Sequence, residues 1–480
     1  MQLPAHKTKI VCTIGPASRS APILGAMIRS GMSVARLNFS HGRLEEHRAD
    51  IRLIQKVAAD LERPVTILID LPGSKIRIGQ LQTEPLTLTK GARVTLTTQE
   101  VMSTATVIPV GYKHLPESVS RGSTIYLNDG LIKLRVEEVS GDDVQCRVVI
   151  GGPLLSHKGL NLPGKKLLMD AVTARDLELV KFGVREGVYT FGLSFIRSAE
   201  DIMNVKEFAR NQSASVGIVA KIERQEAIKN FDGLLSMADA VMIARGDLGT
   251  EIPLEKIPVI QKRLILKANL AGCPVITATQ MLESMTENTR PTRAEVTDVA
   301  NAILDGTDAV MLSEETAIGK YPVETVKMMA KIATTIERKR TGAGFSGDLR
   351  SYVKSTVARH HPTVPDIISL NAVEAAEALK VRYILTPTQS GSTARRISRF
   401  KPACWTLAFS GQERTCYVLA FSYGVYPLFM TIPPGSWHDA ILNFVKGSGL
   451  VKRGDKVILT ERRFTTKPDD TDSFGVITIE

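Results

Sequence analysis

Residues 216 to 249 contain two apolar segments, and each of them ends in a small cluster of charged residues. Lys221 and Glu223 stand two positions apart on the first segment, and in an extended strand this spacing places both side chains on one face. The second segment runs into Asp247, where flanking glycines let the backbone approach a ligand closely and the carboxylate offers a hard oxygen. A lysine beside two carboxylates can hold a divalent cation and a phosphate together.

Each of these features also has a simpler interpretation. A lysine at the end of a strand often extends its ammonium group into water, and a Gly-Asp-Leu-Gly sequence by itself is commonly a turn. Their position on successive strands favours a functional site, because barrel enzymes build their sites at the carboxyl ends of the strands.

Apolar, β-branched runs alternate with helix-like segments, which is typical of βα units and a parallel sheet. Eight such runs are present, the number of strands that closes a barrel. The predicted strands are residues 9–14, 34–39, 65–70, 189–195, 217–223, 240–244, 274–280 and 309–313. Polar or charged residues mark the far ends of most of them: Arg36, Asn38, Ser40, Asp70, Lys221, Glu223, Asp247, Thr279, Gln280 and Ser313.

Two stretches depart from the barrel pattern. Residues 72–168 are rich in Thr, Val and Gly with turn signals, which predicts a small antiparallel β-domain that can close over the site as a lid. Residues 341–365 are polar and interrupted and are interpreted as a linker to a last α/β domain. The predicted fold is α/β, with a (β/α)8 TIM barrel at 1–71 and 169–340, an inserted β-barrel lid domain at 72–168 and a C-terminal α/β regulatory domain at 341–480.

The composition is that of an ordinary globular protein, with 43% hydrophobic and 23% charged residues. The N-terminus lacks the apolar run of a signal peptide, and no apolar stretch is long enough to span a bilayer, so we expect a cytoplasmic protein without a membrane partner. The five cysteines have no metal-binding spacing. No nucleic-acid-binding motif accompanies the net charge of +11, which therefore favours anionic metabolites over nucleic acid.

Several separated motifs occur along the chain: TKIVCTIGPAS (8–18), ARLNFSHG (35–42), AKIERQEAI (220–228), ARGDLGTEI (244–252), TATQMLESM (277–285) and a long motif over 290–322. Their joint order resembles the pyruvate kinase family from about residue 7 to the end of the chain. The resemblance implies a barrel with a β-lid and a C-terminal α/β domain, assembled as a homotetramer. It also implies a glycolytic phosphotransferase that transfers the phosphoryl group of phosphoenolpyruvate to ADP, giving pyruvate and ATP, with Mg2+ or Mn2+ as cofactor.

For phosphoryl transfer, the resemblance assigns roles to five residues of this chain. Lys221 is implied to neutralise the transferring phosphoryl group, and Arg36 and Arg77 are implied to hold phosphate oxygens, for which arginine offers a planar fork of donors. Glu223 and Asp247 correspond to the ligands of the divalent metal, and substrate oxygens and water are expected to complete its coordination.

The resemblance also assigns residues to the enolate, the substrate carboxylate and the nucleotide. Thr279 is implied to stand beside the enolate carbon, while Ser313 and Glu315 belong to a polar network that helps to relay the proton. The backbone amides of Gly246 and Asp247 suit the substrate carboxylate, although an ordinary helix cap is compatible with the same residues. The residues implied to lie near the nucleotide are Asn38, His41, Arg77, Asp129 and Lys158.

The chain departs from the family where many members bind a monovalent cation. The residues at this site correspond to Asn38, Ser40, Asp70, Leu71 and Lys75. Those members have a threonine in place of Leu71 and a glutamate in place of Lys75. A lysine ammonium can take the place of the ion and repel a second cation, so we expect that turnover does not require K+. Further departures are the order Pro72-Gly73-Ser74 and the charge of Glu314.

Residues 386–400 resemble the family's effector loop, which surrounds a phosphate with hydroxyls and backbone amides ahead of a helix. The residues implied to bind the effector are Thr388, Ser390, Gly391, Ser392 and Thr393. A plain Ser/Thr helix cap accounts for the sequence equally well. Arg395, Arg396 and the excess of 20 basic over 12 acidic residues in 338–480 favour a sugar monophosphate or nucleotide monophosphate.

Two other functions are compatible with the sequence. Another Mg2+-dependent barrel enzyme acting on enolates, such as a carbon–carbon lyase, would not require ADP. A catalytically impaired paralogue that serves as a metabolite-binding regulatory protein would be expected to lack one of the residues Lys221, Glu223, Asp247 and Thr279, and all four are present.

Overall fold

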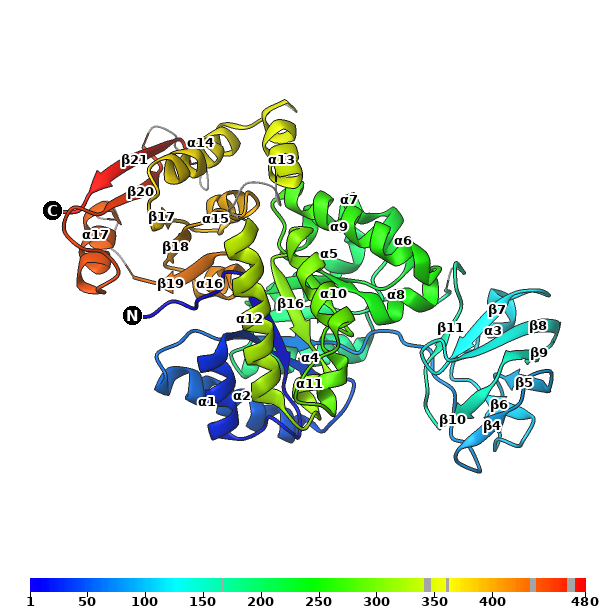
Figure 1. Cartoon of the computed structure of the whole chain (residues 1–480). Helices are drawn as coiled ribbons and strands as arrows, with labels where there is room; N and C mark the ends of the chain where they lie inside the picture. Colours follow the sequence, from blue (N-terminus) through cyan, green and yellow to red (C-terminus); the bar gives the residue numbers. More distant parts are fainter. Residues whose placement is uncertain (166, 341–346, 360–361, 432–436, 464–470) are drawn as a thin grey trace.

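Eight parallel strands form a closed barrel in the middle of the molecule, in the order β1-β16-β15-β14-β13-β12-β3-β2 (Figure 1). The computed structural model describes residues 1–165, 167–340, 347–359, 362–431, 437–463 and 471–480. The barrel strands are β1 Lys9–Thr13, β2 Met32–Asn38, β3 Thr66–Asp70, β12 Thr190–Leu193, β13 Gly217–Ile222, β14 Ala240–Ala244, β15 Val275–Ala278 and β16 Ala309–Leu312. Each strand overlaps one of the eight predicted runs, which confirms the predicted barrel.

All barrel strands except the partly buried β2 are buried on both faces, which explains why they read as continuous apolar runs. The inserted β-domain does not open the barrel, since β12 pairs directly with β3 and places Gly192 beside Asp70. The predicted strand 274–280 is too long: Thr279 and Gln280 have φ angles of 70° and 54°, so β15 ends at Ala278. A positive φ is incompatible with an extended strand.

Helices connect the strands and cover the outside of the barrel. They are α1 Ala21–Ser30, α2 Leu44–Asp60, α4 Ala174–Arg185, α5 Ala199–Asn211, α6 Gln225–Lys229, α7 Phe231–Met237, α8 Arg245–Glu251, α9 Ile257–Ala271, α10 Arg293–Leu304, α11 Glu314–Ala317 and α12 Pro322–Arg340. Helix α10 begins with a capping box, in which the Thr292 hydroxyl accepts from the Glu295 amide and the Glu295 carboxylate accepts from the Thr292 amide.

The inserted domain lies beside the carboxyl ends of the barrel strands and away from the C-terminal domain (Figure 1). Its elements are β4 Leu86–Leu88, β5 Arg93–Thr97, β6 Val107–Pro109, α3 Leu115–Ser118, β7 Thr124–Leu127, β8 Ile132–Ser140, β9 Asp143–Ile150, β10 Gly152–Leu154 and β11 Leu160–Asn161. They form a six-stranded sheet and a two-stranded sheet, and β5 pairs with β6 in parallel. The other strand pairs of this domain are antiparallel, as predicted. The parallel pair was not predicted, because periodicity within one strand carries no information on its partner's direction.

The C-terminal domain is a five-stranded sheet in the order β19-β18-β17-β20-β21, and only β20 and β21 pair antiparallel. Its elements are α13 Gly347–Arg359, α14 Val364–Ala378, β17 Tyr383–Pro387, α15 Ser392–Ser398, β18 Trp405–Ser410, α16 Glu413–Leu419, β19 Val425–Phe429, α17 Trp437–Gly447, β20 Lys456–Glu461 and β21 Ser473–Thr478. In the described parts of the chain, no helix is long and apolar enough to cross a membrane.

Helix α13 corrects the interpretation of residues 341–365 as a linker. Val353 and Val357 stand one helical turn apart and are buried in an apolar cluster with Ala372 and Val373 of α14. Leu349, Val353 and Val357 recur at a four-residue spacing, which is helical, but the segment is short and otherwise polar, so the helix depends on the surface against which it packs. Residues 341–346 and 360–361 lie outside the described part of the chain.

The amino ends of the barrel strands rest on the C-terminal domain. Lys9, the first residue of β1, is buried and donates to the Val425 carbonyl at 2.6 Å. Burial lowers the pKa of Lys9 to about 7, although Glu337 and Asp308 act in the opposite direction. Lys401 and Asp308 form a second buried contact, at 2.6 Å. This end of the barrel thus serves as a domain junction.

Candidate active site

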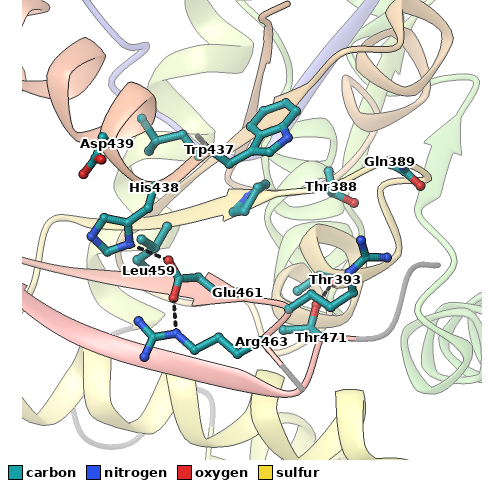
Figure 2. Close-up of a pocket in the computed structure, with 13 residues that line it drawn as sticks. Thr388, Gln389, Thr393, Trp437, His438, Asp439, Leu459, Glu461, Arg463 and Thr471 are labelled. Atoms are coloured by element: carbon teal, nitrogen blue, oxygen red, sulfur yellow. Dashed lines mark hydrogen bonds and ion pairs between the residues drawn. The ribbon is translucent and has the colours of Figure 1, made fainter. Parts of the chain in front are cut away.

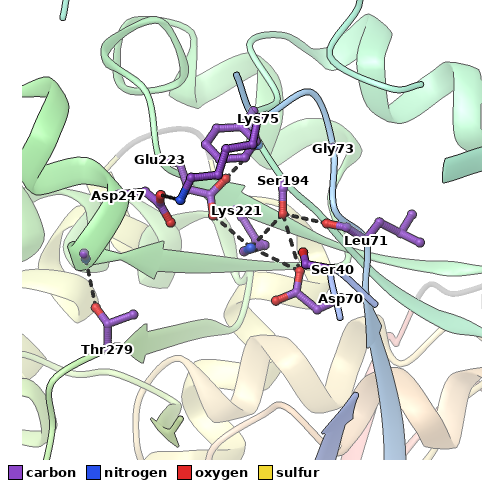
Figure 3. A network of polar contacts seen from close by, with 12 residues as sticks. Ser40, Asp70, Leu71, Gly73, Lys75, Ser194, Lys221, Glu223, Asp247 and Thr279 are labelled. Carbon is purple, nitrogen blue, oxygen red and sulfur yellow. Dashed lines mark hydrogen bonds and ion pairs between the residues drawn. The ribbon is translucent and has the colours of Figure 1, made fainter. Parts of the chain in front are cut away.

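Lys221 lies at the centre of a polar network at the carboxyl ends of β3, β12 and β13 (Figure 3). Its ammonium nitrogen is 2.8 Å from Glu223 Oε1 and 3.1 Å from Asp70 Oδ1, and it donates to Ser194 Oγ at 2.7 Å. The predicted meeting of Lys221 and Glu223 on one face is confirmed by this distance. The side chain is only 10% exposed, so the charge is held in one place by its partners.

The charges of this network stabilise one another. Burial by itself lowers the pKa of Lys221, but Asp70 and Glu223 outweigh it, so that pKa lies above its ordinary value. Burial likewise raises the pKa of Asp70, but Lys221 and Arg36 outweigh it and hold that pKa below its usual range. Arg36 donates through Nε to Asp70 at 2.7 Å and through Nη1 to Thr13 Oγ1 at 2.9 Å. Both cations are therefore fixed toward the open end of the barrel.

Glu223 and Asp247, the two predicted metal ligands, follow β13 and β14, which are neighbouring strands. Glu223 Oε2 accepts from the Phe195 amide at 2.7 Å, while the buried Oε1 lies 2.8 Å from the Lys221 ammonium nitrogen. Within the described residues no group of three or more His, Cys, Asp or Glu side chains could hold a metal. The two carboxylates supply the hard oxygen donors that Mg2+ prefers, and substrate oxygens and water would complete its coordination.

Lys75 lies between the lid and the barrel, away from the residues expected to surround a monovalent ion. Its ammonium nitrogen is 3.1 Å from Asp129 Oδ1 on the lid and 3.0 Å from Asp247 Oδ1. Burial lowers the pKa of Lys75, but Asp247 and Asp129 outweigh it and raise that pKa overall. Gly159 leaves room for the side chain, since a Cβ atom there would lie 2.7 Å from Lys75 Cε.

The other residues of the expected monovalent site lie around Asp70. Asn38 is opposite Asp70 in the pairing of β2 with β3, and Asn38 Oδ1 accepts from the Ser40 amide at 3.1 Å. The Leu71 carbonyl accepts from Ser194 Oγ at 2.7 Å. In this structure Lys221, and not Lys75, supplies the cation beside Asp70, because strand alternation leads Lys221 into the barrel mouth.

Thr279 stands on the far side of the site from Asp70 (Figure 3). Its hydroxyl oxygen accepts from the Gly246 amide at 2.9 Å and donates to the Ala278 carbonyl at 2.6 Å. Glu315 accepts from the amides of Ser313 at 2.6 Å and Leu282 at 3.1 Å. Burial raises the pKa of Glu315. Glu315 therefore ties the end of β16 to the segment that follows Thr279, while the exposed Glu314 has no such contact in the described structure.

Three of the five residues predicted near the nucleotide, His41, Arg77 and Lys158, form a rim of basic residue types, here called the basic rim. Arg77 donates to the His157 carbonyl at 2.9 Å, and Lys158 follows directly in the chain. Burial lowers the pKa of His41, and the charges of Arg77, Arg36, Lys75 and Lys158 lower it further. Arg77, Arg36, Lys75 and Lys158 thus bring several positive charges together around His41.

Two residues of the site were missed by the sequence interpretation. Ser194 connects Lys221 to the Leu71 carbonyl, and Arg245 contacts the backbone of Thr279. Ser194 follows the fourth strand, so its place at a carboxyl end was a usable signal. Arg245 was visible only as part of the ARGDLGTEI motif, where nothing in the sequence indicates the direction of its side chain.

A second hollow, of about 720 Å3, lies in the C-terminal domain between α15, α17 and β20 (Figure 2). Of the five predicted effector residues, Thr388 and Thr393 line it, whereas Ser390, Gly391 and Ser392 do not. The other lining residues include Trp437, His438, Glu461, Arg462, Arg463 and Thr471.

Arg395 and Arg396, whose charge favoured a phosphorylated effector in the sequence, do not line this hollow. Arg396 instead forms an ion pair with Asp366 of α14 at 3.2 Å and donates to Ser392 of α15. Glu461 forms part of the floor instead, where it contacts His438 Nδ1 at 2.5 Å and accepts from Arg463 Nε at 2.7 Å.

A closed (β/α)8 barrel with a lid beside its carboxyl ends, and with fixed cations and carboxylates between the two, defines an enzyme site for a phosphorylated anion. Family models described as "Pyruvate kinase, barrel domain" and "Pyruvate kinase, alpha/beta domain" match residues 5–326 and 366–477. The chain belongs to the pyruvate kinase family and is accordingly a phosphotransferase.

Individual relatives cover the whole chain. A pyruvate kinase of Thermococcus litoralis is 54% identical over 100% of both chains, and one of Clostridium acetobutylicum is 40% identical over 99% of this chain and 100% of its own. The crystal structure of a pyruvate kinase from Cryptosporidium parvum superimposes with a TM-score of 0.90 at 35% identity, covering 99% of this chain and 97% of the other. The full-length agreement includes the lid and the C-terminal domain.

Proposed function

We propose that the protein transfers the phosphoryl group of phosphoenolpyruvate to ADP and releases pyruvate and ATP. The observation that carries this proposal is the placement of Lys221 between Asp70 and Glu223, within the barrel mouth that the lid adjoins. Phosphoryl transfer requires mainly positioning and neutralisation of charge, and these buried, paired groups provide both without reorganisation.

The chain's own residues divide the work as follows. Lys221 and Arg36 hold the phosphoryl oxygens, since both are oriented by Asp70. The Thr279 hydroxyl adjoins the enolate, and the proton reaches it through ordered water, because a hydroxyl is too weak an acid to protonate an enolate efficiently alone. Arg77, Lys158 and the other residues of the basic rim receive the nucleotide.

Glu223 and Asp247 are the residues that would hold Mg2+, or Mn2+ in its place. The bound ion would neutralise phosphate charge as a Lewis acid. The protein's own contribution is to hold the buried Glu223 beside Lys221, and to present Asp247 from the first turn of α8.

A coupled assay of pyruvate formation tests this function. Activity that requires phosphoenolpyruvate, ADP and Mg2+ together supports it. Turnover without ADP would support the lyase, and absence of turnover even with sugar phosphates present would support an impaired regulatory paralogue.

Independence from K+ is the second part of the proposal. Lys75 supports it, because it replaces with a positive charge the glutamate that members with a monovalent-cation site have at this position. We expect replacement of tetramethylammonium chloride by KCl at constant ionic strength to change wild-type activity by less than about twofold. In Lys75→Glu, KCl is expected to raise activity by at least about fivefold, within the usual range of coupling between ligands. A strong K+ requirement of the wild type, or a Lys75→Glu enzyme indifferent to K+, contradicts the proposal.

A monophosphate effector in the hollow of the C-terminal domain is the third part. The hydroxyls of Thr388 and Thr393 suit one phosphate, whereas Glu461 on the opposite side disfavours a second phosphate and suits sugar hydroxyls. We expect a sugar or nucleoside monophosphate to lower the half-saturating phosphoenolpyruvate concentration by about fivefold or more, and a sugar bisphosphate to act weakly.

Thr388→Val is expected to abolish the response to the monophosphate while Glu461→Gln increases the response to the bisphosphate. The basal activity measured without effector serves as the control for both variants. Half-saturation and cooperativity that no phosphorylated sugar changes would refute the effector site. A homotetramer and a cytoplasmic location complete the proposal, on the strength of family membership.

A further inference from the structure

The backbone that carries Thr279 is held in an unusual conformation. Thr279 and Gln280 both have positive φ angles, 70° and 54°, and they follow directly on the buried strand β15. L-residues rarely adopt this left-handed region, and two in succession require support from the surrounding structure. Gln280 is exposed, so its own side chain is not buried in a way that would provide that support.

The support comes from Arg245, the first residue of α8. Its Nε donates to the Ala278 carbonyl at 3.1 Å, and its Nη2 donates to the Thr279 carbonyl. The other terminal nitrogen is 2.7 Å from Asp298 on α10, which fixes the guanidinium from behind. One planar fork thus binds two successive carbonyls on one side and a carboxylate on the other.

The same segment connects Arg245 to the substrate side of the site. Gly246, the next residue in the chain, donates its amide to Thr279 Oγ1 at 2.9 Å. The guanidinium therefore fixes the main chain of Thr279 while the adjoining amide fixes its hydroxyl. A shift of the main chain would misdirect the hydroxyl even though every atom of Thr279 was present.

We propose that Arg245 is a positioning residue, which keeps the left-handed turn at Thr279 and Gln280 in place and thereby aims the Thr279 hydroxyl at the reacting carbon. The proposal rests on the proposed function for the meaning of that hydroxyl. Arg245 does not touch substrate in this role. Its importance lies in the geometry of five donors arranged in one plane, which lysine cannot reproduce.

The test first removes the guanidinium of Arg245 and then removes the strain of the positive φ angle at Gln280. We expect Arg245→Met to lower kcat by about a hundredfold, as misplacement of about 1 Å can do, with a smaller change in KM for phosphoenolpyruvate. Glycine adopts positive φ without strain. Adding Gln280→Gly to the Arg245→Met protein is therefore expected to raise its kcat by at least about fivefold. Gln280→Gly alone is expected to leave kcat within about threefold of wild type.

Lys380→Gly is the matched control, because Lys380 is also exposed, also has a positive φ, of 52°, and lies in the C-terminal domain. Combined with Arg245→Met, it should restore nothing. If Gln280→Gly restores no more activity than Lys380→Gly does, the positioning role is refuted. Asp298→Asn provides a milder variant should Arg245→Met fail to fold, and Gln280→Gly should rescue it in the same way.

A readout independent of catalysis separates this proposal from the proposed function. Amide hydrogen exchange of a peptide spanning 276–285, followed by mass spectrometry, should be faster in Arg245→Met than in the wild type. Unchanged exchange would overturn the positioning role even in an active enzyme. If exchange is faster in Arg245→Met but the wild type has no pyruvate kinase activity, the positioning role of Arg245 is supported and only the proposed function is refuted.

Discussion

Lys221→Met is expected to lower kcat for pyruvate formation by about a thousandfold or more, since the loss of one electrostatic stabiliser in a buried site commonly costs a hundredfold to a thousandfold. Its ammonium is the cation that lies between Asp70 and Glu223, and methionine fills the same volume without charge. Lys221→Arg keeps a charge but not its position, so we expect it to recover only a small part of the activity. The measurement is the coupled assay at saturating phosphoenolpyruvate, ADP and Mg2+.

Lys9→Met is the matched control, because Lys9 is an equally buried lysine at the opposite end of the barrel. Lys9→Met should leave kcat within about twofold of the wild-type value. Thermal unfolding should also be compared, because Lys221→Met leaves two buried carboxylates without their shared cation, and breaking a buried pair costs about 3–5 kcal/mol. Near-native kcat in a folded Lys221→Met protein would show that the assignment of the site is wrong.

Glu223→Gln is expected to weaken binding of Mn2+ by at least about tenfold and to lower kcat/KM by about a hundredfold or more. The amide keeps the shape of the side chain but removes the charge that faces Lys221 and the metal. Binding of Mn2+ to the protein with phosphoenolpyruvate can be followed by electron paramagnetic resonance, which needs no turnover.

Glu251→Gln provides the comparison, since Glu251 is another buried carboxylate, seven per cent exposed, on the same helix α8 as Asp247. Burial raises the pKa of Glu251 as it does that of Glu223, so the two substitutions remove similar groups from similar surroundings. Equal effects of the two variants on Mn2+ binding would refute the role of Glu223 as a metal ligand.

Much of the fold follows from the sequence because barrel strands are buried on both faces. Continuous apolar runs therefore mark all eight strands, although the inserted domain separates the third from the fourth. The Lys221 and Glu223 pair was predictable for the same reason, since alternation along a strand is a local property.

Features that depend on two distant segments were not predictable. Residues 347–359 form α13, in which Val353 and Val357 are buried against α14. The helical spacing of Leu349, Val353 and Val357 was a usable signal, but a helix this short is stable only on the surface that buries it. The parallel pairing of β5 and β6 in the lid likewise depends on the path of the chain between them.

The sequence by itself determined the family, the barrel and the chemical types of the site residues, because these are written in motifs and local periodicity. Only the tertiary structure decided which groups meet. It placed Lys75 against Asp129 and Asp247 instead of the expected monovalent site, and it turned Arg396 away from the effector hollow. Long cationic side chains have many rotamers and pair with whichever carboxylate the fold brings within reach, and that carboxylate can come from any part of the chain.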